Sequence, residues 1–235
     1  MSGEALVPRL RAALVSLFPE LCDAVLDASI LGRARRRGLV EISVRTPRDW
    51  AGGRHRVVDD RPYGGGPGMV LAAPPVAACL DALQVQMPRA RLLMTSPQGR
   101  RLDQDRLREL SRESQLIILC GHYEGFDERI VQLYRPEEFS LGDYVLSGGE
   151  LPALTLLDGL VRLLPGVLGN EASAVDDSFG DDGLLDHPCY TKPRVFRELQ
   201  VPPVLCSGDH EAIAAWRREQ RLQRTQARRP DLEQP

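Results

Sequence analysis

Three consecutive segments between residues 91 and 164 repeat one arrangement: a short apolar run, a loop that contains glycine, and a run with helical periodicity. The pattern predicts strands at 91–95, 116–120 and 143–146, and helices at 103–111, 127–134 and 151–164. Strands that alternate with helices are typical of a parallel sheet covered by helices. We therefore expect an α/β fold whose three loops meet at the carboxyl ends of the strands, where such sheets bind ligands.

The loops of this repeat span residues 96–99, 121–125 and 147–149. Glycine lets backbone amides approach a ligand that a Cβ atom would block. Several such loops at one sheet edge favour a ligand with extended polar parts, such as a nucleotide. Neither a Walker loop nor a GxGxxG fingerprint is present, so a generic nucleotide-binding protein remains only an alternative.

A fourth glycine-rich stretch, DDRPYGGGPGM, occupies residues 59–69. Its two prolines and three consecutive glycines exclude a helix or a regular strand. One interpretation is a flexible surface loop. The other is a loop that closes over a ligand, with Asp59, Asp60 and Arg61 as polar contacts, since long loops of this composition are often functional.

The remaining chain predicts strands at 12–18 and 39–45 and helices at 20–29, at 74–83 and from about residue 209. Small and acidic residues predict an inter-domain linker at 167–183, between a cofactor-binding domain at 1–166 and a small, mainly helical domain at 184–235. In the last helix Arg217, Arg221, Arg224 and Arg228 share one face. That face is either solvated or a surface for nucleic-acid phosphates.

Composition excludes several classes of protein. The net charge is −3, and no apolar run is long enough to span a membrane. The N-terminus lacks the pattern of a signal peptide. The five cysteines form no CxxC pair, which indicates reduced thiols in a cytoplasmic protein, and the four histidines form no metal-ligand cluster.

Seven long motifs occur in order along the chain: DDRPYGGGPGM, SPQGRRLDQ, CGHYEGFDERI, SLGDYVLSGGELPALTLLDG, PGVLGNEASAVDDSF, LLDHPCYTKP and VPPVLCSGDH. Together they resemble the bacterial tRNA (guanine-37-N1)-methyltransferase family, from about residue 16 to residue 230. The resemblance implies a parallel α/β sheet with a deep trefoil knot and a C-terminal tRNA-binding domain. It also implies S-adenosyl-L-methionine as methyl donor, a homodimer with sites at its interface, and guanosine 37 of tRNA, preceded by a guanosine, as substrate.

The resemblance assigns two catalytic residues. Asp177 matches the family's proposed general base for N1 of guanine, and Arg162 matches the residue that holds the guanine and its O6. From the residues alone, Asp177 is one carboxylate of an acidic linker. Arg162 lies four residues after Asp158, the spacing of a surface ion pair on a helix.

The remaining predicted contacts come from the same motifs and from the arginine face of the last helix. The residues expected to bind the cofactor are Pro97, Gly121, Tyr123, Glu124, Leu141, Gly142, Asp143, Tyr144, Val145, Leu146, Gly148 and Gly149. Those expected to bind the substrate are Asp59, Arg61, Gly65, Ser178, Arg217 and Arg221. The family is associated with Mg²⁺, for which the sequence shows no site, and no protein partner other than a second copy is evident. Cys120 is expected to be a buried apolar residue and not a nucleophile.

Two further functions remain as alternatives. One is a related knotted methyltransferase that acts on a ribose 2′-hydroxyl or on ribosomal RNA. The other is a non-catalytic RNA-binding protein that kept the fold. The stretches EASAVDDSF and DDRPYGGGPGM argue against the first, and the presence of Asp177 and Arg162 argues against the second.

Overall fold

The computed structural model describes residues 7–169 and 177–233, and the chain divides into two compact units, Met1–Gly169 and Asn170–Pro235. The first unit is built on a five-stranded sheet in the order β2-β1-β6-β5-β7, and every strand pair in it is parallel. The strands are β1 Leu10–Val15, β2 Val40–Arg45, β5 Arg91–Arg101, β6 Gln115–Leu119 and β7 Glu137–Ser140. The predicted parallel α/β sheet is therefore confirmed.

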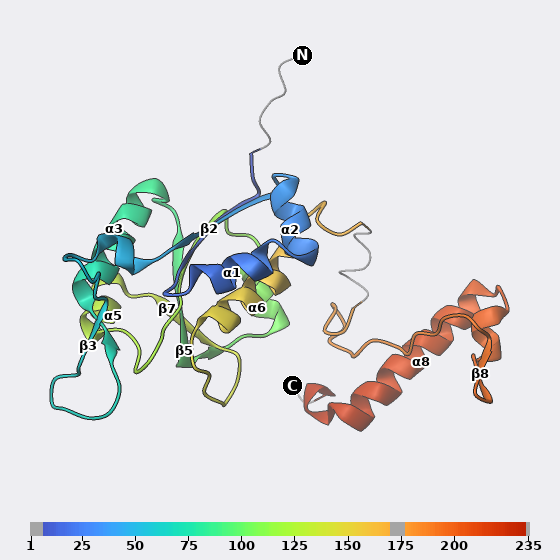
Figure 1. The fold of residues 1–235 in the computed structure, drawn as a ribbon. Coiled ribbons are helices and arrows are strands. Elements are labelled where there is room, and N and C mark those ends of the chain that lie inside the picture. Colours follow the sequence, from blue (N-terminus) through green and yellow to red (C-terminus); the bar gives the residue numbers. More distant parts are fainter. Residues whose placement is uncertain (1–6, 170–176, 234–235) are drawn as a thin grey trace, which may run out of the picture. The chain divides into compact units, whose positions relative to one another are not determined.

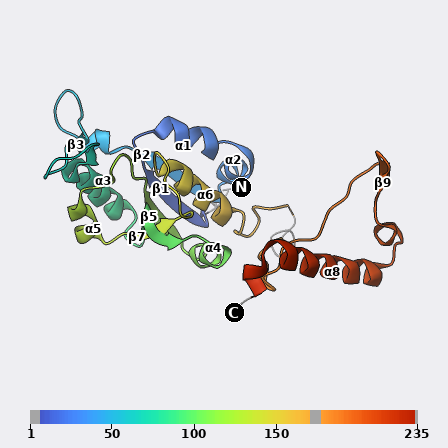
Figure 2. The ribbon, with the colours of Figure 1, turned by 90° about the horizontal axis from the view of Figure 1, so that it is seen from below.

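Helices cover both faces of this sheet (Figures 1 and 2). One face carries α1 Pro19–Leu26, α2 Ser29–Arg36, α4 Gln104–Leu110 and α6 Glu150–Val161. The other carries α3 Ala73–Gln86 and α5 Glu128–Tyr134, with the 3-10 helix η1 Pro47–Trp50 packed against α3. Alternate residues of β1 enter opposite cores, Leu14 the first and Val15 the second, as the period of a strand requires.

The central strand β6 explains why its sequence is uniformly apolar. Its residues Leu116, Ile117, Ile118 and Leu119 are all fully buried, because helices cover the sheet on both sides. Each such side chain stabilises the fold by roughly 1.5–3 kcal/mol relative to an exposed one. A short two-stranded ladder, β3 Asp59–Asp60 with β4 Val70–Leu71, closes the base of the glycine-rich loop.

The strand predicted at residues 143–146 is wrong. The third strand of the repeat is β7, six residues earlier, and residues 141–149 form an irregular loop. The polar sequence EEFS forms a strand because its edge position is held by ion pairs: Glu137 accepts from Arg91 at 2.7 Å and also pairs with Arg106. The apolar side chains of Tyr144 and Val145, which suggested a strand, are exposed instead.

Three other boundaries differ from the sequence prediction. Strand β1 ends at Val15, because the hydroxyl of Ser16 turns back to accept the backbone N–H of Phe18 at 2.9 Å. The helix expected at 20–29 is α1, which ends at Leu26, and the separate helix α2 that follows was not predicted. The expected turn at 96–99 lies within β5, whose register against β7 shifts between Thr95 and Arg100. The other predicted strands and helices of this unit are confirmed to within a few residues.

The second unit is organised around one long helix, α8 His210–Arg228, which begins after Asp209 as expected. The Asp209 carboxylate accepts the backbone N–H of Ala212 at 3.0 Å and caps the helix. The unit also contains a hairpin of β8 Val195–Phe196 and β9 Leu199–Gln200, and the 3-10 helices η2 Pro203–Cys206 and η3 Pro230–Glu233. Buried Thr225 on α8 accepts the backbone N–H of Leu185 at 2.9 Å, which fastens the preceding segment to the helix.

Part of the predicted linker, residues 170–176, lies outside the described residues, and the predicted domain boundaries remain a prediction. Within the part of the chain that the structure describes, no helix is long and apolar enough to cross a membrane.

Candidate active site

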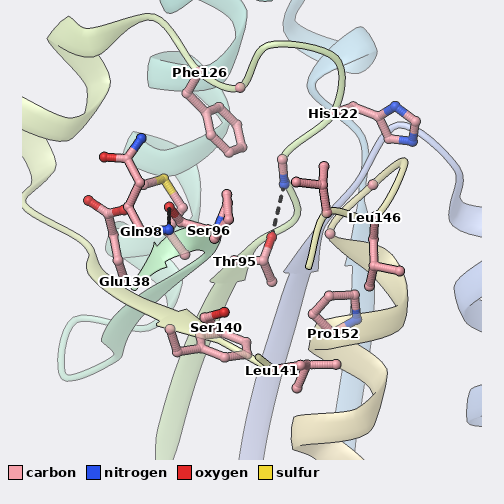
Figure 3. A pocket seen from close by; sticks show the side chains of 18 of the residues that line it. Thr95, Ser96, Gln98, His122, Phe126, Glu138, Ser140, Leu141, Leu146 and Pro152 are labelled. Carbon is pink, nitrogen blue, oxygen red and sulfur yellow. Dashed lines mark hydrogen bonds between the residues drawn. The ribbon is translucent and has the colours of Figure 1, made fainter. Parts of the chain in front are cut away.

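A cavity of about 400 Å³ lies at the carboxyl ends of β6 and β7 and beside the irregular stretch of β5 at residues 94–98 (Figure 3). Its size is that of a small-molecule site. The wall is formed by residues 94–98, 121–126, 138–142 and 144–149, together with Glu128, Val131 and Pro152. The structure thus brings the loops together at the sheet edge where the sequence pattern predicted a ligand.

Thr95 holds the loops in place from below (Figure 3). Its buried hydroxyl donates to the backbone carbonyl of Leu119 at 3.2 Å and accepts the backbone N–H of Gly121 at 3.2 Å. The N–H of Gly149 in turn donates to the carbonyl of Gly121 at 2.7 Å. The second and third loops are therefore linked through Gly121, and their backbone positions are fixed before any ligand binds.

Gly149 is required at this junction. A Cβ atom there would overlap the Thr95 hydroxyl and lie 2.6 Å from the backbone nitrogen of Gly121. Both neighbours are held by the hydrogen bonds described above, so neither has room to move away. The close approach of the two loops explains the paired glycines in the sequence.

We expect Gly149→Ala to destabilise the protein by about 1–3 kcal/mol, since overpacking forces the backbone to shift. The same shift opens the cavity, so binding of its ligand weakens. Thermal unfolding and calorimetric titration measure the two effects. Gly52→Ala is the matched control, because a Cβ atom at Gly52 meets nothing within 4 Å. Equal unfolding temperatures for the two variants would contradict the assignment.

The glycine-rich loop at residues 59–69 lies against the second loop of the cavity. The N–H of Glu124 donates to the carbonyl of Met69 at 3.0 Å, and the N–H of Leu71 donates to the carbonyl of Gly125 at 2.8 Å. A Cβ atom on Gly68 would overlap the Glu124 side chain. At the exposed end of the loop, Tyr63 is fully accessible to solvent. This placement favours the interpretation of a loop beside a binding site over that of an unattached surface loop.

The charge of the cavity wall has one sign. Three carboxylates line it, from Glu124, Glu128 and Glu138, and among the described residues no arginine or lysine does. Such a wall favours a ligand that carries positive charge. The described residues contain no group of three or more His, Cys, Asp or Glu side chains placed to hold a metal ion, so we assign no residue to Mg²⁺.

Eleven of the twelve residues predicted to bind the cofactor line this cavity, and Asp143 is the exception. Sequence reasoning missed several other wall residues: Thr95, Gln98, His122, Phe126 and Glu138. The sequence contains little indication of these residues. Thr95 and Glu138 lie in strands, and they reach the cavity because the register of β5 shifts and because β7 pairs with β5. His122 lies within the second loop and could have been included from its motif.

Comparison with known proteins assigns the family. Residues 10–235 match the family model described as tRNA (Guanine-1)-methyltransferase TrmD. A tRNA (guanine-N(1)-)-methyltransferase of Geobacter sulfurreducens is 52% identical over 93% of this chain and 89% of its own. Proteins of the same name from Salmonella newport and Klebsiella pneumoniae are each 53% identical over 93% of this chain and 86% of theirs. The chain belongs to this family.

The arginine predicted to be catalytic, Arg162, does not line the cavity. Arg162 follows the last residue of α6, whose first turn carries the wall residue Pro152. The helix has twelve residues and is therefore about 18 Å long. Within one copy of this tRNA (guanine-1)-methyltransferase family member, Arg162 and the cavity are thus at opposite ends of one helix.

The other predicted residues lie in the second unit or on the glycine-rich loop. Asp177 is half-buried, and its carbonyl accepts the N–H of Gly180 at 3.2 Å. The hydroxyl of Ser178 accepts the N–H of Asp186 at 2.9 Å. On α8, Arg217 is exposed, whereas Arg221 pairs with Asp182 at 2.8 Å. The loop residues Asp59, Arg61 and Gly65 lie outside the cavity wall, and their role in substrate binding stays a prediction.

The cysteines divide into two groups. Burial raises the pKa of the Cys22 thiol to about 11 and that of Cys79 to about 12, and it raises the pKa of Cys120 well above its ordinary value. Cys189 and Cys206 are exposed. Because the thiolate is the reactive form, the geometry supports a buried, inert Cys120.

We expect iodoacetamide at pH 8 to label Cys189 and Cys206 first, since the three buried thiols stay protonated and covered. Peptide mass spectrometry over a time course measures the order. Labelling of Cys120 in the native protein at the rate of Cys206 would contradict this order. As a control, labelling in denaturant should show that all five thiols react once they are exposed.

Proposed function

We propose that this protein transfers a methyl group from S-adenosyl-L-methionine to N1 of guanosine 37 in tRNA. The observation that carries the proposal is the cavity at the carboxyl edge of the sheet, whose wall consists of the three motif loops. Membership of the tRNA (guanine-1)-methyltransferase family supplies the reaction class. A substrate that is tRNA implies a cytoplasmic location.

The residues of the cavity fit S-adenosyl-L-methionine. The glycines at Gly121 and Gly148-Gly149 let the second and third loops approach each other, and residues of both loops line a cavity large enough for a ligand with several polar parts. The exposed apolar side chains of Tyr144, Val145 and Leu146 line the cavity and suit an adenine ring. The acidic wall suits a sulfonium cation. When bound, this compound supplies a methyl group that its positively charged sulfur has already activated.

The remaining chemistry concerns guanine. Its N1 carries a proton and is a poor nucleophile, so a base must remove that proton as the N–C bond forms. We assign this role to Asp177. General-base catalysis typically raises a reaction rate by about two to four orders of magnitude. Negative charge that develops on O6 requires a donor, which we assign to Arg162. The transfer is direct, without a covalent enzyme intermediate.

The position of Arg162 supports the proposal of a homodimer. Because Arg162 and the cavity lie at opposite ends of α6, one copy alone does not place this arginine beside the methyl donor. A second copy that packs across the cavity would supply the missing side chains. We propose that each active site combines the cavity of one copy with catalytic residues of its partner.

Subunit mixing tests the shared site. Gly149→Val, which forces the second and third loops apart and so disrupts the cavity, and Asp177→Asn, which removes the base, are each expected to be inactive. If the site is shared, half of the dimers in an equal mixture are mixed, and each mixed dimer has one intact site, so activity returns to about a quarter of the wild-type value. No recovery after confirmed subunit exchange would place both residues in one copy.

Two structural features of the family complete the proposal. We propose that residues 137–149 belong to a trefoil knot, which the contact of Gly149 with Gly121 and the place of β7 beside β5 support. We also propose that the second unit binds tRNA, with Arg217 on α8 as a phosphate contact. Proteolysis that separates the two units should therefore abolish tRNA binding and leave cofactor binding intact.

The decisive experiment is methyl transfer. The protein is incubated with S-adenosyl-L-methionine and unmodified tRNA that carries guanosine at positions 36 and 37, and the methyl group is located by nuclease digestion and mass spectrometry. N1-methylguanosine at position 37 is the expected product. A methyl group elsewhere would indicate a related specificity. Binding of both ligands without transfer would favour the non-catalytic RNA-binding alternative.

A further inference from the structure

A carboxylate that the proposed reaction does not use lies directly behind the cavity wall. Glu150 is the first residue of α6 and is only 2% exposed. Its Oε1 accepts a hydrogen bond from the hydroxyl of Ser16 at 2.7 Å. Its Oε2 lies 3.7 Å from Nε2 of His122, a residue of the cavity wall. Burying a carboxylate costs free energy, so its presence in the core needs an explanation beyond packing.

Glu150 lies against three segments, two of which line the cavity. Ser16 follows the last residue of β1, and its hydroxyl is fixed by the N–H of Phe18 as well as by Glu150. His122 is paired with Gly148 in an isolated β-bridge. A Cβ atom on Gly148 would lie 2.5 Å from Oε2 of Glu150 and would overlap the His122 ring. The carboxylate thus positions both the second loop and the Gly148-Gly149 turn.

The charge of Glu150 adds to that of the wall. Glu124, Glu128 and Glu138 line the cavity, and no arginine or lysine of the described residues does. A charge that is removed from water interacts more strongly with its surroundings and is less screened by salt than an exposed one. Three carboxylates therefore line the cavity, and a fourth lies in the core beside the wall residue His122.

This arrangement distinguishes the two forms of the methyl donor. When the methyl group is transferred, its bond to sulfur breaks and a bond to N1 of guanine forms, while the N1 proton goes to the base. The sulfur keeps the electron pair of the broken bond, so a sulfonium cation becomes a neutral thioether. The ligand loses one positive charge, and the attraction from the surrounding carboxylates falls at that moment.

We propose that Glu150, together with the lining carboxylates, makes the cavity prefer the cationic methyl donor to its neutral demethylated product. Glu150 acts as a positioning and specificity residue and takes no part in bond making. The inference rests on the proposed function, since it requires S-adenosyl-L-methionine as ligand. Its consequence is that product release is favoured by the reaction itself.

The test compares two dissociation constants of the full-length protein, for S-adenosyl-L-methionine and for S-adenosyl-L-homocysteine, by calorimetric titration. Glu150→Gln removes the charge and keeps an oxygen that accepts from Ser16. We expect this variant to lose roughly five- to tenfold more affinity for the cationic donor than for the neutral product. An equal loss for both ligands would show that Glu150 is only structural and would overturn the proposal.

Two further variants separate charge from position. Ser16→Ala removes the hydrogen bond and keeps the charge, so both affinities should fall by the same factor. Glu20→Gln removes an exposed carboxylate from the first turn of α1 and should change neither. A selective loss of donor affinity in Glu20→Gln would indicate a long-range effect of net charge and would also overturn the proposal.

If Glu150→Gln fails to fold, Glu138→Gln provides the same measurement, because Glu138 lines the cavity at the edge strand and is not part of the core. An unchanged ratio of the two affinities in that variant would contradict the proposal. Failure of the proposed function looks different: the wild-type protein would then bind neither compound.

Discussion

Asp177→Asn is expected to lower kcat for tRNA methylation by about two to four orders of magnitude, the contribution of a well-placed general base. Asparagine has nearly the same shape but does not accept the proton that must leave N1 of guanine. Because the proposed site of the methyl donor is the cavity of the other unit, its dissociation constant should stay unchanged. Single-turnover methylation with saturating tRNA measures the chemical step directly.

Asp181→Asn is the control for this prediction, since Asp181 is an exposed carboxylate of the same acidic segment. It should retain wild-type turnover. Thermal unfolding of both variants shows whether either change acts through stability. Near-normal turnover in Asp177→Asn would mean that Asp177 is only a charged residue of the linker. The general base would then have to be one of the carboxylates of the cavity wall.

The second large effect is expected at Arg162. Arg162→Ala should lower kcat roughly a hundred- to a thousandfold, since one donor to a developing oxyanion contributes that much. Arg162→Lys should recover only part of the loss, because lysine keeps the charge but not the planar fork that grips a base edge. Steady-state kinetics with varied tRNA separates a change in kcat from a change in KM.

Arg112→Ala is the matched control, because Arg112 is an exposed arginine just after α4, which packs against α6. Its kinetics should equal those of the wild-type protein. Unchanged kinetics in Arg162→Ala would mean that Arg162 does no more than pair with Asp158 on the helix surface. Such a pair contributes only about 0.2–0.5 kcal/mol to stability.

Local patterns in the sequence determined most of the first unit. The uniformly apolar run of β6 required cover on both faces, and the glycine loops required a sheet edge with room for a ligand. The apolar period also placed α3, α4, α5 and α6, since a helix must turn one face to the core. The motif resemblance added the reaction, which no periodicity contains, and the family match agrees with it.

Prediction from the sequence failed where long-range contacts outweigh the strand propensity of a local segment. Residues 143–146 have the composition of a strand, yet β7 forms at the polar stretch EEFS. Its first residue, Glu137, pairs with Arg91 and Arg106, and Arg91 lies 46 residues earlier in the chain. Local propensity does not include such ion pairs, and a strand at a sheet edge depends on its neighbours more than on its own residues.

The sequence by itself therefore determined the class of fold, the loops that form the cavity and, through its motifs, the family. Only the tertiary structure decided which side chains complete the wall and what lies behind it. Ser16 and Glu150 are 134 residues apart, and their hydrogen bond exists because β1 and α6 pack in the same core. Contacts of this kind depend on the packing of whole elements, which the period of hydrophobic residues does not specify.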